Sequence, residues 1–119
     1  MDQRSLGQFG EEQAARYLRR RFYTILERNF RCRLGEIDLI ARRGGILAFV
    51  EVKLRRDDSH GEAREFVTAR KQQRLIAAAE LWLSLHETDL QPRFDVIEVY
   101  APQGTDGPVK LRHVENAFM

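Results

Sequence analysis

Two short apolar segments of the sequence, residues 35–42 and 46–54, carry four charged side chains in their interiors, Glu36, Asp38, Glu51 and Lys53, besides Arg42 at the end of the first. Strands that pack into a core normally exclude charged groups unless these are paired or bind a ligand. Two carboxylates held close together repel each other, and a shared proton, a nearby lysine or a divalent cation would relieve that repulsion. Carboxylates with a lysine beside them are suited to binding Mg²⁺ or Mn²⁺ and to acting on a phosphate.

The glycine pair at residues 44–45 predicts how these side chains face each other, because such a pair is typical of a tight antiparallel hairpin. Its register places Asp38 opposite Glu51 and Glu36 opposite Lys53, with Cβ atoms about 5 Å apart. Alternation points all four to one face and the neighbouring apolar residues to the other, namely Ile37, Leu39, Val50 and Val52. The alternative interpretation is a partly solvated strand face with an ordinary Glu–Lys pair.

Apolar residues at helical spacing predict two helices. The first begins at Ser5, runs to about residue 21 and places Leu6, Ala14, Leu18 and Phe22 at one spacing. Glu11 lies toward this apolar face. There it would either complete a metal site with the strand acids or be an ordinary acid near a helix N-terminus. The second helix covers about residues 66–85, with one face formed by Leu75, Ala78, Ala79 and Trp82.

The remaining segments predict strands and an overall fold. Strands are expected over 23–31, 35–42, 46–54 and 93–101, and residues 109–115 form either a last strand or a ragged end. The length of 119 residues suits one domain over residues 1–119. The prediction is an α/β fold of order α-β-β-β-α-β, with a central mixed sheet flanked by helices.

Charge is distributed unevenly along the chain. Residues 16–56 carry a net charge of +8 and the remainder −6, and 17 of the 20 basic residues are arginine. Arginine forks onto phosphate oxygens, so a nucleic acid partner is indicated, although a solvated basic surface is equally consistent with charge alone. The single cysteine, Cys32, excludes an internal disulfide, and the sequence has neither an apolar signal region nor a transmembrane run. We therefore expect a soluble cytoplasmic protein with no membrane partner.

Other polar residues carry weaker predictions. The three histidines and Cys32 show no zinc spacing, although His60, in a predicted polar loop over 57–62, lies close enough in sequence to Lys53 for a site role to be considered. Asp95 follows Arg93 by two residues, and a buried ion pair or a strand cap is the preferred interpretation of that pair.

The combined motifs resemble a known family. An acid on one strand followed by Glu-x-Lys on the next resembles the metal-dependent nucleases with a restriction-endonuclease-like (PD-(D/E)xK) fold. The stretches "GEEQAARYL", "NFRCRLGEIDLIA", "FVEVK" and "RFDVIEV" resemble more closely the YraN family of bacterial proteins, from about residue 7 to 99. That family looks similar to archaeal Holliday-junction resolvases. One departure is Ile37, where the nuclease superfamily often has proline.

The resemblance implies a role for each matching residue. Asp38 and Glu51 would ligate Mg²⁺ or Mn²⁺, with the backbone carbonyl of Val52 as an extra ligand and Glu11 as an outer one. Lys53 would position the attacking water. Supporting residues would be Lys71, Gln72 and Glu36, and the phosphate backbone would be held by Arg31, Arg33, Arg42, Arg43, Arg55 and Arg56. The hairpin turn and the loop over residues 55–65 would flank the site.

The resemblance implies an endonuclease that hydrolyses phosphodiester bonds, in DNA rather than RNA, on branched or single-stranded structures. A homodimer is allowed, because resolvase-like enzymes work as symmetric dimers. Two alternatives stay open at this point: a non-catalytic nucleic-acid-binding module with the same fold, and an RNA-processing nuclease.

Overall fold

The computed structural model describes residues 3–56 and 67–118. Its elements are α1 (Gln3–Arg20), β1 (Thr24–Cys32), β2 (Gly35–Arg43), β3 (Ile46–Arg55), α2 (Ala69–Leu85), β4 (Gln91–Tyr100), the short 3₁₀ helix η2 (Gly104–Asp106) and β5 (Lys110–Val114). The predicted polar loop 57–62, with His60, lies outside the described residues. Nothing in the described residues forms a helix long and apolar enough to span a membrane.

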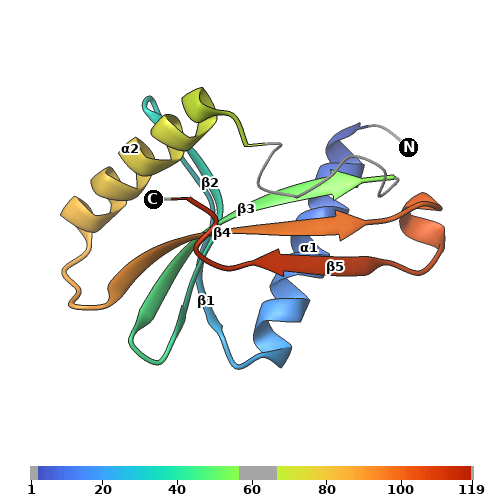
Figure 1. The fold of residues 1–119 in the computed structure, drawn as a ribbon, viewed down its shortest axis with the longest axis horizontal. Coiled ribbons are helices and arrows are strands. Elements are labelled where there is room, and N and C mark those ends of the chain that lie inside the picture. The colour runs from blue at the N-terminus through green and yellow to red at the C-terminus, as the bar shows by residue number, and fades with distance from the viewer. Residues whose placement is uncertain (1–2, 57–66, 119) are drawn as a thin grey trace.

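The five strands form one sheet in the order β1-β2-β3-β4-β5 (Figure 1). Only β3 and β4 run parallel, and α2 makes the crossover between them; the other neighbours are antiparallel. This confirms the predicted α/β fold with a mixed sheet flanked by helices. The ambiguous segment 109–115 proves to be a strand, and the arrangement is compatible with a restriction-endonuclease-like core.

The two helices cover opposite faces of the sheet, and each buries its own set of strand side chains. The α2 face packs Leu75, Ala78 and Trp82 against apolar strand residues such as Phe49, as the helical spacing predicted. The α1 face packs Ala14 and Leu18 against alternate residues of the same strands. Because side chains alternate along β3, one strand supplies both cores.

The first helix differs from its prediction at both ends. It begins at Gln3 rather than at a Ser5 cap, which is consistent with the high helix propensity of glutamine and arginine. It ends at Arg20, so Phe22 lies beyond the helix. The Phe22 side chain is 86% exposed instead of joining the apolar face that contains Ala14 and Leu18.

The glycine turn sets the register of the hairpin as predicted, but the pairing of β2 with β3 ends early. Arg43 pairs with Ile46, and the ladder continues only as far as Leu39 and Val50. Beyond that point β2 stays paired with β1, and β3 stays paired with β4. Asp38 and Glu51 therefore stand where two adjacent strands separate, and the predicted direct pairings of Asp38 with Glu51 and of Glu36 with Lys53 do not form.

Side chains also stop alternating at this point of β2. Leu39 packs in the α1 core, whereas Ile37 packs in the α2 core, so the predicted common face for these two residues is wrong. Opposite them on β1, Asn29 has a positive φ of 54° and interrupts regular strand geometry between Arg28 and Phe30. The irregularity allows both apolar residues to be buried, and it leaves Asp38 between the two cores.

Asp95 forms the buried ion pair that was the preferred interpretation of its sequence context. Arg93 donates from Nε and Nη2 to the two carboxylate oxygens at 2.8 Å each, and the Asn116 backbone N–H donates at 3.1 Å. His113 Nε2 lies 2.8 Å from Oδ2. Burial alone would raise the pKa of Asp95, but these hydrogen bonds outweigh it and lower the pKa. The cluster joins β4 to β5 on the α1 side, away from the hairpin acids.

Candidate functional site

The Asp38 carboxylate takes the place of a missing backbone partner where β2 and β3 separate. The Val52 N–H of β3 donates to Asp38 Oδ2 at 2.8 Å, a bond that the ladder no longer supplies from a carbonyl. Burial raises the pKa of Asp38 to about 7, and the neighbouring charge of Glu51 adds to that rise. Glu11 and Glu36 contribute smaller repulsions. Asp38 is thus a carboxylate whose negative charge the surrounding residues do not neutralise.

Glu51 contributes the second carboxylate, and two lysines lie beside it. Its side chain is only 5% exposed and points to the α2 side of the sheet, where Lys71 Nζ approaches Oε1 to 2.8 Å. Lys53, one pleat further along β3, lies 3.9 Å from the same oxygen. Each lysine comes from a different element, so closing α2 onto the sheet assembles the group.

The two lysines have opposite electrostatic environments. Burial lowers the pKa of Lys53, and the nearby positive charge of Lys71 lowers it further. For Lys71 burial acts in the same direction, but the hydrogen bond to Glu51 and the negative charges of Glu51 and Asp38 together outweigh it, so the pKa of Lys71 is raised. Lys71 therefore stays a firmly charged partner of Glu51, while Lys53 releases its proton more readily than an ordinary lysine.

The start of α2 is fixed by bonds that position Lys71. The Thr68 hydroxyl caps the helix by accepting from the Lys71 N–H at 3.2 Å. The Gln72 side chain donates to the Val67 carbonyl at 2.9 Å and ties the first turn to the preceding segment. Gln72 thus helps to fix the first turn of the helix that carries Lys71. Both residues were predicted from the sequence as supporting residues.

Three other sequence-predicted residues lie around this group in different ways. Glu36 is exposed and pairs with Arg31 of β1 at 3.3 Å, not with Lys53. Glu11 is half-buried on α1, near enough to raise the pKa of Asp38. Val52 bonds Asp38 through its N–H, and its carbonyl stays a predicted ligand.

Glu51 is buried and Asp38 is half-buried, and a hard divalent cation between the two carboxylates would relieve their mutual repulsion. The contacts already described use Asp38 Oδ2 and Glu51 Oε1, so Asp38 Oδ1 and Glu51 Oε2 remain as oxygens that could bind a cation. Within residues 3–56 and 67–118, no three His, Cys, Asp or Glu side chains gather closely enough to hold an ion alone. A pair of carboxylates, here Asp38 and Glu51, suits Mg²⁺ or Mn²⁺, because Mg²⁺ commonly takes one or two carboxylates and completes its shell with water and substrate phosphate.

A cavity of about 500 Å³ lies between α2 and the β1–β2 hairpin. Neither Asp38 nor Glu51 lines it, and it is joined to them through Lys71, which lines the cavity and contacts Glu51. Its basic lining comes from two elements, with Arg31 on β1 and three residues on α2: Arg70, Lys71 and Arg74. Gly35 forms part of the wall, where a Cβ atom would come within 2.6 Å of the Arg74 carbonyl oxygen. The missing side chain lets β2 approach the helix and brings these cations around one hollow.

The sequence-predicted arginines do not form one group. Arg31 and Arg33 lie at the β1–β2 end near the cavity, while Arg42 and Arg43 lie by the hairpin turn, about five residues or 16 Å of strand from Asp38. Arg55 is 10% exposed and bonds Glu98 at 2.6 Å, and Arg56 is exposed at the end of β3. The hairpin turn therefore does not flank the carboxylates as predicted, because β2 and β3 extend between them.

Sequence reasoning missed two cavity residues, Arg70 and Arg74. Their signal was present, since residues 70, 71 and 74 recur at helical spacing and share one side of α2. Such a basic stripe usually indicates only a solvated helix face, and only the position of α2 against β2 gives it a cavity.

Replacing Asp38 with Asn should stabilise the metal-free protein by about 1–2 kcal/mol at pH 8, because the variant keeps the acceptor for Val52 N–H and removes a half-buried charge that Glu51 repels. The folded-state pKa of about 7 lies above the unfolded value near 3.9, so the charge destabilises the fold above pH 7. That cost disappears as the pH falls toward 4, and the advantage of the variant disappears with it. Urea denaturation in EDTA at several pH values measures this.

Asp89→Asn is the matched control for this change, because Asp89 is exposed beyond the end of α2. It should leave the unfolding free energy within about 0.5 kcal/mol of the wild type. A lower stability of Asp38→Asn in EDTA would instead identify Asp38 as a partner in a structural ion pair.

Comparisons with known proteins match nearly the whole chain. The model of the "Uncharacterised protein family UPF0102" matches residues 10–99, which include the four hairpin residues and Lys71. A UPF0102 protein of Symbiobacterium thermophilum is 48% identical over 116 residues, which cover 97% of both chains. One from Syntrophotalea carbinolica is 52% identical over 115 residues, covering 96% of this chain and 91% of the relative. One from Caldanaerobacter subterraneus is 41% identical, covering 99% and 98%. The chain therefore belongs to the UPF0102 family, which is the YraN family predicted from its motifs.

Proposed function

We propose that this protein is a metal-dependent nuclease that hydrolyses phosphodiester bonds, with DNA as the favoured substrate. The observation that carries the proposal is the meeting of Asp38 and Glu51 where β2 and β3 separate, with Lys53 and Lys71 at the same Glu51 oxygen. A purely structural strand end has no need of a buried Glu51 carboxylate beside a half-buried Asp38 carboxylate whose charge it repels.

Each residue takes a distinct role in this proposal. Asp38 and Glu51 would hold Mg²⁺ or Mn²⁺, which supplies positive charge that polarises the scissile phosphate. Lys53, with its lowered pKa, would orient the attacking water and accept its proton. Lys71 would keep Glu51 in place, and Glu11 would be an outer ligand.

The basic cavity supports a polyanionic substrate beside these residues. Arg31, Arg70 and Arg74 line the same cavity as Lys71, and Lys71 contacts Glu51, so a phosphate backbone in the cavity would lie on the side of Lys71 away from the carboxylate group or reach past it to Glu51. Such contacts position a nucleic acid without reading its sequence, which suits an enzyme that selects branched or single-stranded structures. A cytoplasmic location follows from the same proposal, since that is where the DNA substrate is found.

One observation favours a second candidate, a nucleic-acid-binding module without catalysis. The Lys71–Glu51 contact of 2.8 Å makes Glu51 one half of an ion pair, as in a site whose carboxylates are only structural. An RNA-processing nuclease would use the same residues, and the choice between DNA and RNA depends on contacts to the sugar.

Mn²⁺ titration followed by calorimetry tests the proposal. We expect saturable binding to the wild type and loss of that binding in Asp38→Asn, because half of the carboxylate set becomes neutral. Branched, nicked and single-stranded DNAs would then be incubated with Mn²⁺ and assayed for cleavage.

The titration should be repeated with an oligonucleotide present, since substrate phosphate can complete such a site. Absence of Mn²⁺ binding in both titrations, together with DNA binding that depends only on salt, would instead support the binding module.

A further inference from the structure

The end of α1 holds a phenylalanine in a backbone position that glycine normally occupies. The Phe22 N–H donates to the Arg19 carbonyl at 3.0 Å, and the Tyr23 N–H donates to the Leu18 carbonyl at 2.9 Å. This is the Schellman pattern of a helix C-terminus, in which the residue at the position of Phe22 takes a left-handed conformation. Phe22 has φ of 72°, a conformation that is strained for a bulky side chain.

Burial does not explain this residue either. The Phe22 side chain is 86% exposed, more than the other exposed large apolar residues of the described chain, Leu26, Leu34 and Leu85. The next residue, Tyr23, is 4% exposed, so the chain buries one ring and presents the other to solvent. Folding alone would be better served by glycine at residue 22.

Three arginines directly precede Phe22 in the chain, and a fourth, on β2, reaches the same turn. The Arg21 guanidinium lies over the Tyr17 ring at 4.9 Å. Arg19, Arg20 and Arg21 are exposed, and Arg43 joins them by donating to the Arg21 carbonyl at 3.2 Å while its guanidinium stacks on Tyr23 at 4.7 Å. Of the ion pairs within residues 3–56 and 67–118, none links these four guanidinium groups to a carboxylate. We call Arg19, Arg20, Arg21, Phe22 and Arg43 the α1-end cluster.

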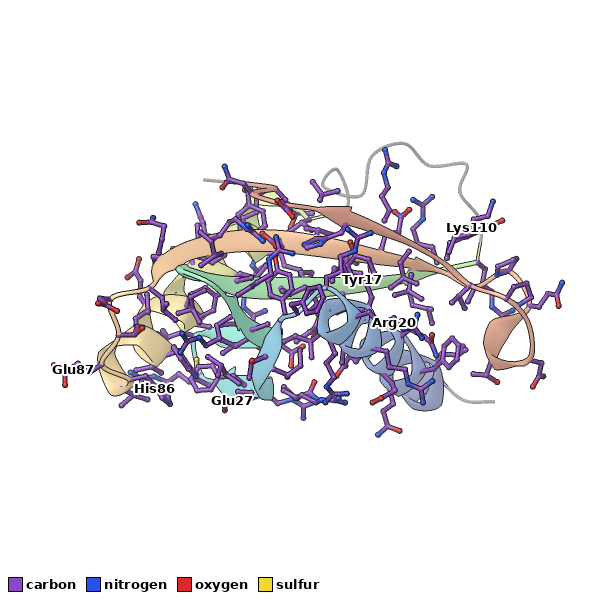
Figure 2. All side chains as sticks on the ribbon, turned by 90° about the horizontal axis from the view of Figure 1, so that it is seen from below. Tyr17, Arg20, Glu27, His86, Glu87 and Lys110 are labelled. Carbon is purple, nitrogen blue, oxygen red and sulfur yellow. The ribbon has the colours of Figure 1, made fainter. Side chains whose placement is uncertain are left out.

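Helix geometry explains only part of the cluster. Cations in the last turn are favoured by the helix dipole, which accounts for Arg19 and Arg20. The helix dipole accounts neither for Phe22, which is uncharged, nor for Arg43, which belongs to β2. In Figure 2, Tyr17 of the same helix lies between α1 and the sheet, where its hydroxyl lies 3.2 Å from His113 Nδ1. Tyr17 is thus a packed aromatic of α1, unlike Phe22.

We propose that the α1-end cluster is a second nucleic-acid site that binds an unpaired strand, with a base stacked on Phe22 and phosphates held by the arginines. Base–aromatic stacking on a positively charged surface is how proteins bind single strands without sequence preference. A duplex does not fit as well, because its base faces are already stacked on each other. A membrane surface fits less well, because one ring buries little apolar area.

This site is separate from the carboxylate group and does not depend on cleavage. Arg43 is about five residues along β2 from Asp38, or about 16 Å of strand. The cluster would therefore hold an unpaired tail of a substrate at a distance from the carboxylates, and its binding can be measured with EDTA present.

Phe22→Gly separates the proposed role from a structural one, because the two predict opposite effects. We expect the variant to bind a twelve-nucleotide poly-dT probe about tenfold more weakly in EDTA, from the loss of one stacked base. Its melting temperature should rise by about 4 °C, from relief of the strained backbone. Phe22→Trp should keep wild-type affinity, and Leu85→Ala, which shortens another exposed apolar side chain, should change nothing.

Three results would overturn this proposal. The first is wild-type affinity of Phe22→Gly for poly-dT, and the second is an equal loss of affinity for a blunt duplex. The third is a loss confined to anionic phosphatidylserine vesicles, which would make the cluster a membrane contact. The charge contribution has its own readout: Arg20→Gln should reduce the slope of log affinity against log salt by about 0.7 for the single strand.

Discussion

Replacing Lys53 with Ala is expected to lower the rate of metal-dependent DNA cleavage by at least roughly a thousandfold, which is the usual size of a lost general base. Affinities for Mn²⁺ and DNA should stay within about threefold, because Lys53 lies 3.9 Å from Glu51 and Lys71 makes the closer contact. The measurement is cleavage of whichever DNA the wild type cuts, together with calorimetry in Mn²⁺.

Two further lysine variants define what Lys53 does. Lys53→Arg keeps a positive charge but cannot release its proton at neutral pH, so it should stay inactive if Lys53 accepts the proton of the attacking water. Recovery of cleavage in Lys53→Arg would instead assign Lys53 a purely electrostatic role. Lys110→Ala is the matched control, since Lys110 is exposed on β5 at the end of the molecule away from Glu27 and His86 (Figure 2). A normal cleavage rate in Lys53→Ala would show that Lys53 has no part in the cleavage reaction.

The parts of the fold that could be predicted are those set by local chemistry. Two glycines specify a tight turn, and the turn specifies the register of the strands beside it, so the pairing of Arg43 with Ile46 followed from the sequence. Helical spacing likewise identified the buried face of α2, including Trp82. These features depend on residues that are close in sequence.

The separation of β2 from β3 depends on partners that are distant in sequence. β2 follows β1 through Arg31 and Glu36, and β3 follows β4 up to Tyr100. The sequence of the hairpin does not indicate where pairing with β1 and β4 will replace the pairing of β2 with β3. The predicted direct pairing of Asp38 with Glu51 was therefore wrong, because Asp38 accepts from the Val52 N–H, although Glu51 is near enough for its charge to raise the pKa of Asp38.

The same dependence on contacts distant in sequence explains why the cavity and the end of α1 were not predicted. Arg70 and Arg74 form a visible stripe in sequence, but only tertiary packing against Gly35 makes them face Arg31. Phe22 continues the apolar spacing of α1, but the helix ends at Arg20 and the following turn directs its ring outward. Periodicity predicts a face and does not predict where the helix stops.

Replacing Lys71 with Met should destabilise the protein by about 2–3 kcal/mol in EDTA, because a buried carboxylate loses its charged hydrogen-bond partner. Glu51 is 5% exposed, and only the more distant Lys53 would remain beside it. Urea denaturation in EDTA measures the loss, with Lys110→Met as the control that changes an exposed lysine.

Mn²⁺ should then reverse part of this destabilisation, which distinguishes a metal site from a structural ion pair. Lys71 repels a cation and occupies Glu51 Oε1, so its removal should tighten Mn²⁺ binding about tenfold. A tenfold difference in affinity narrows the stability gap at saturating Mn²⁺ by about 1.4 kcal/mol, because ligand binding to the native state adds to its stability. If the difference in unfolding free energy between the wild type and Lys71→Met is the same in EDTA and in Mn²⁺, then Glu51 only pairs with Lys71 and does not bind metal. The carboxylates would then belong to a binding module rather than a nuclease.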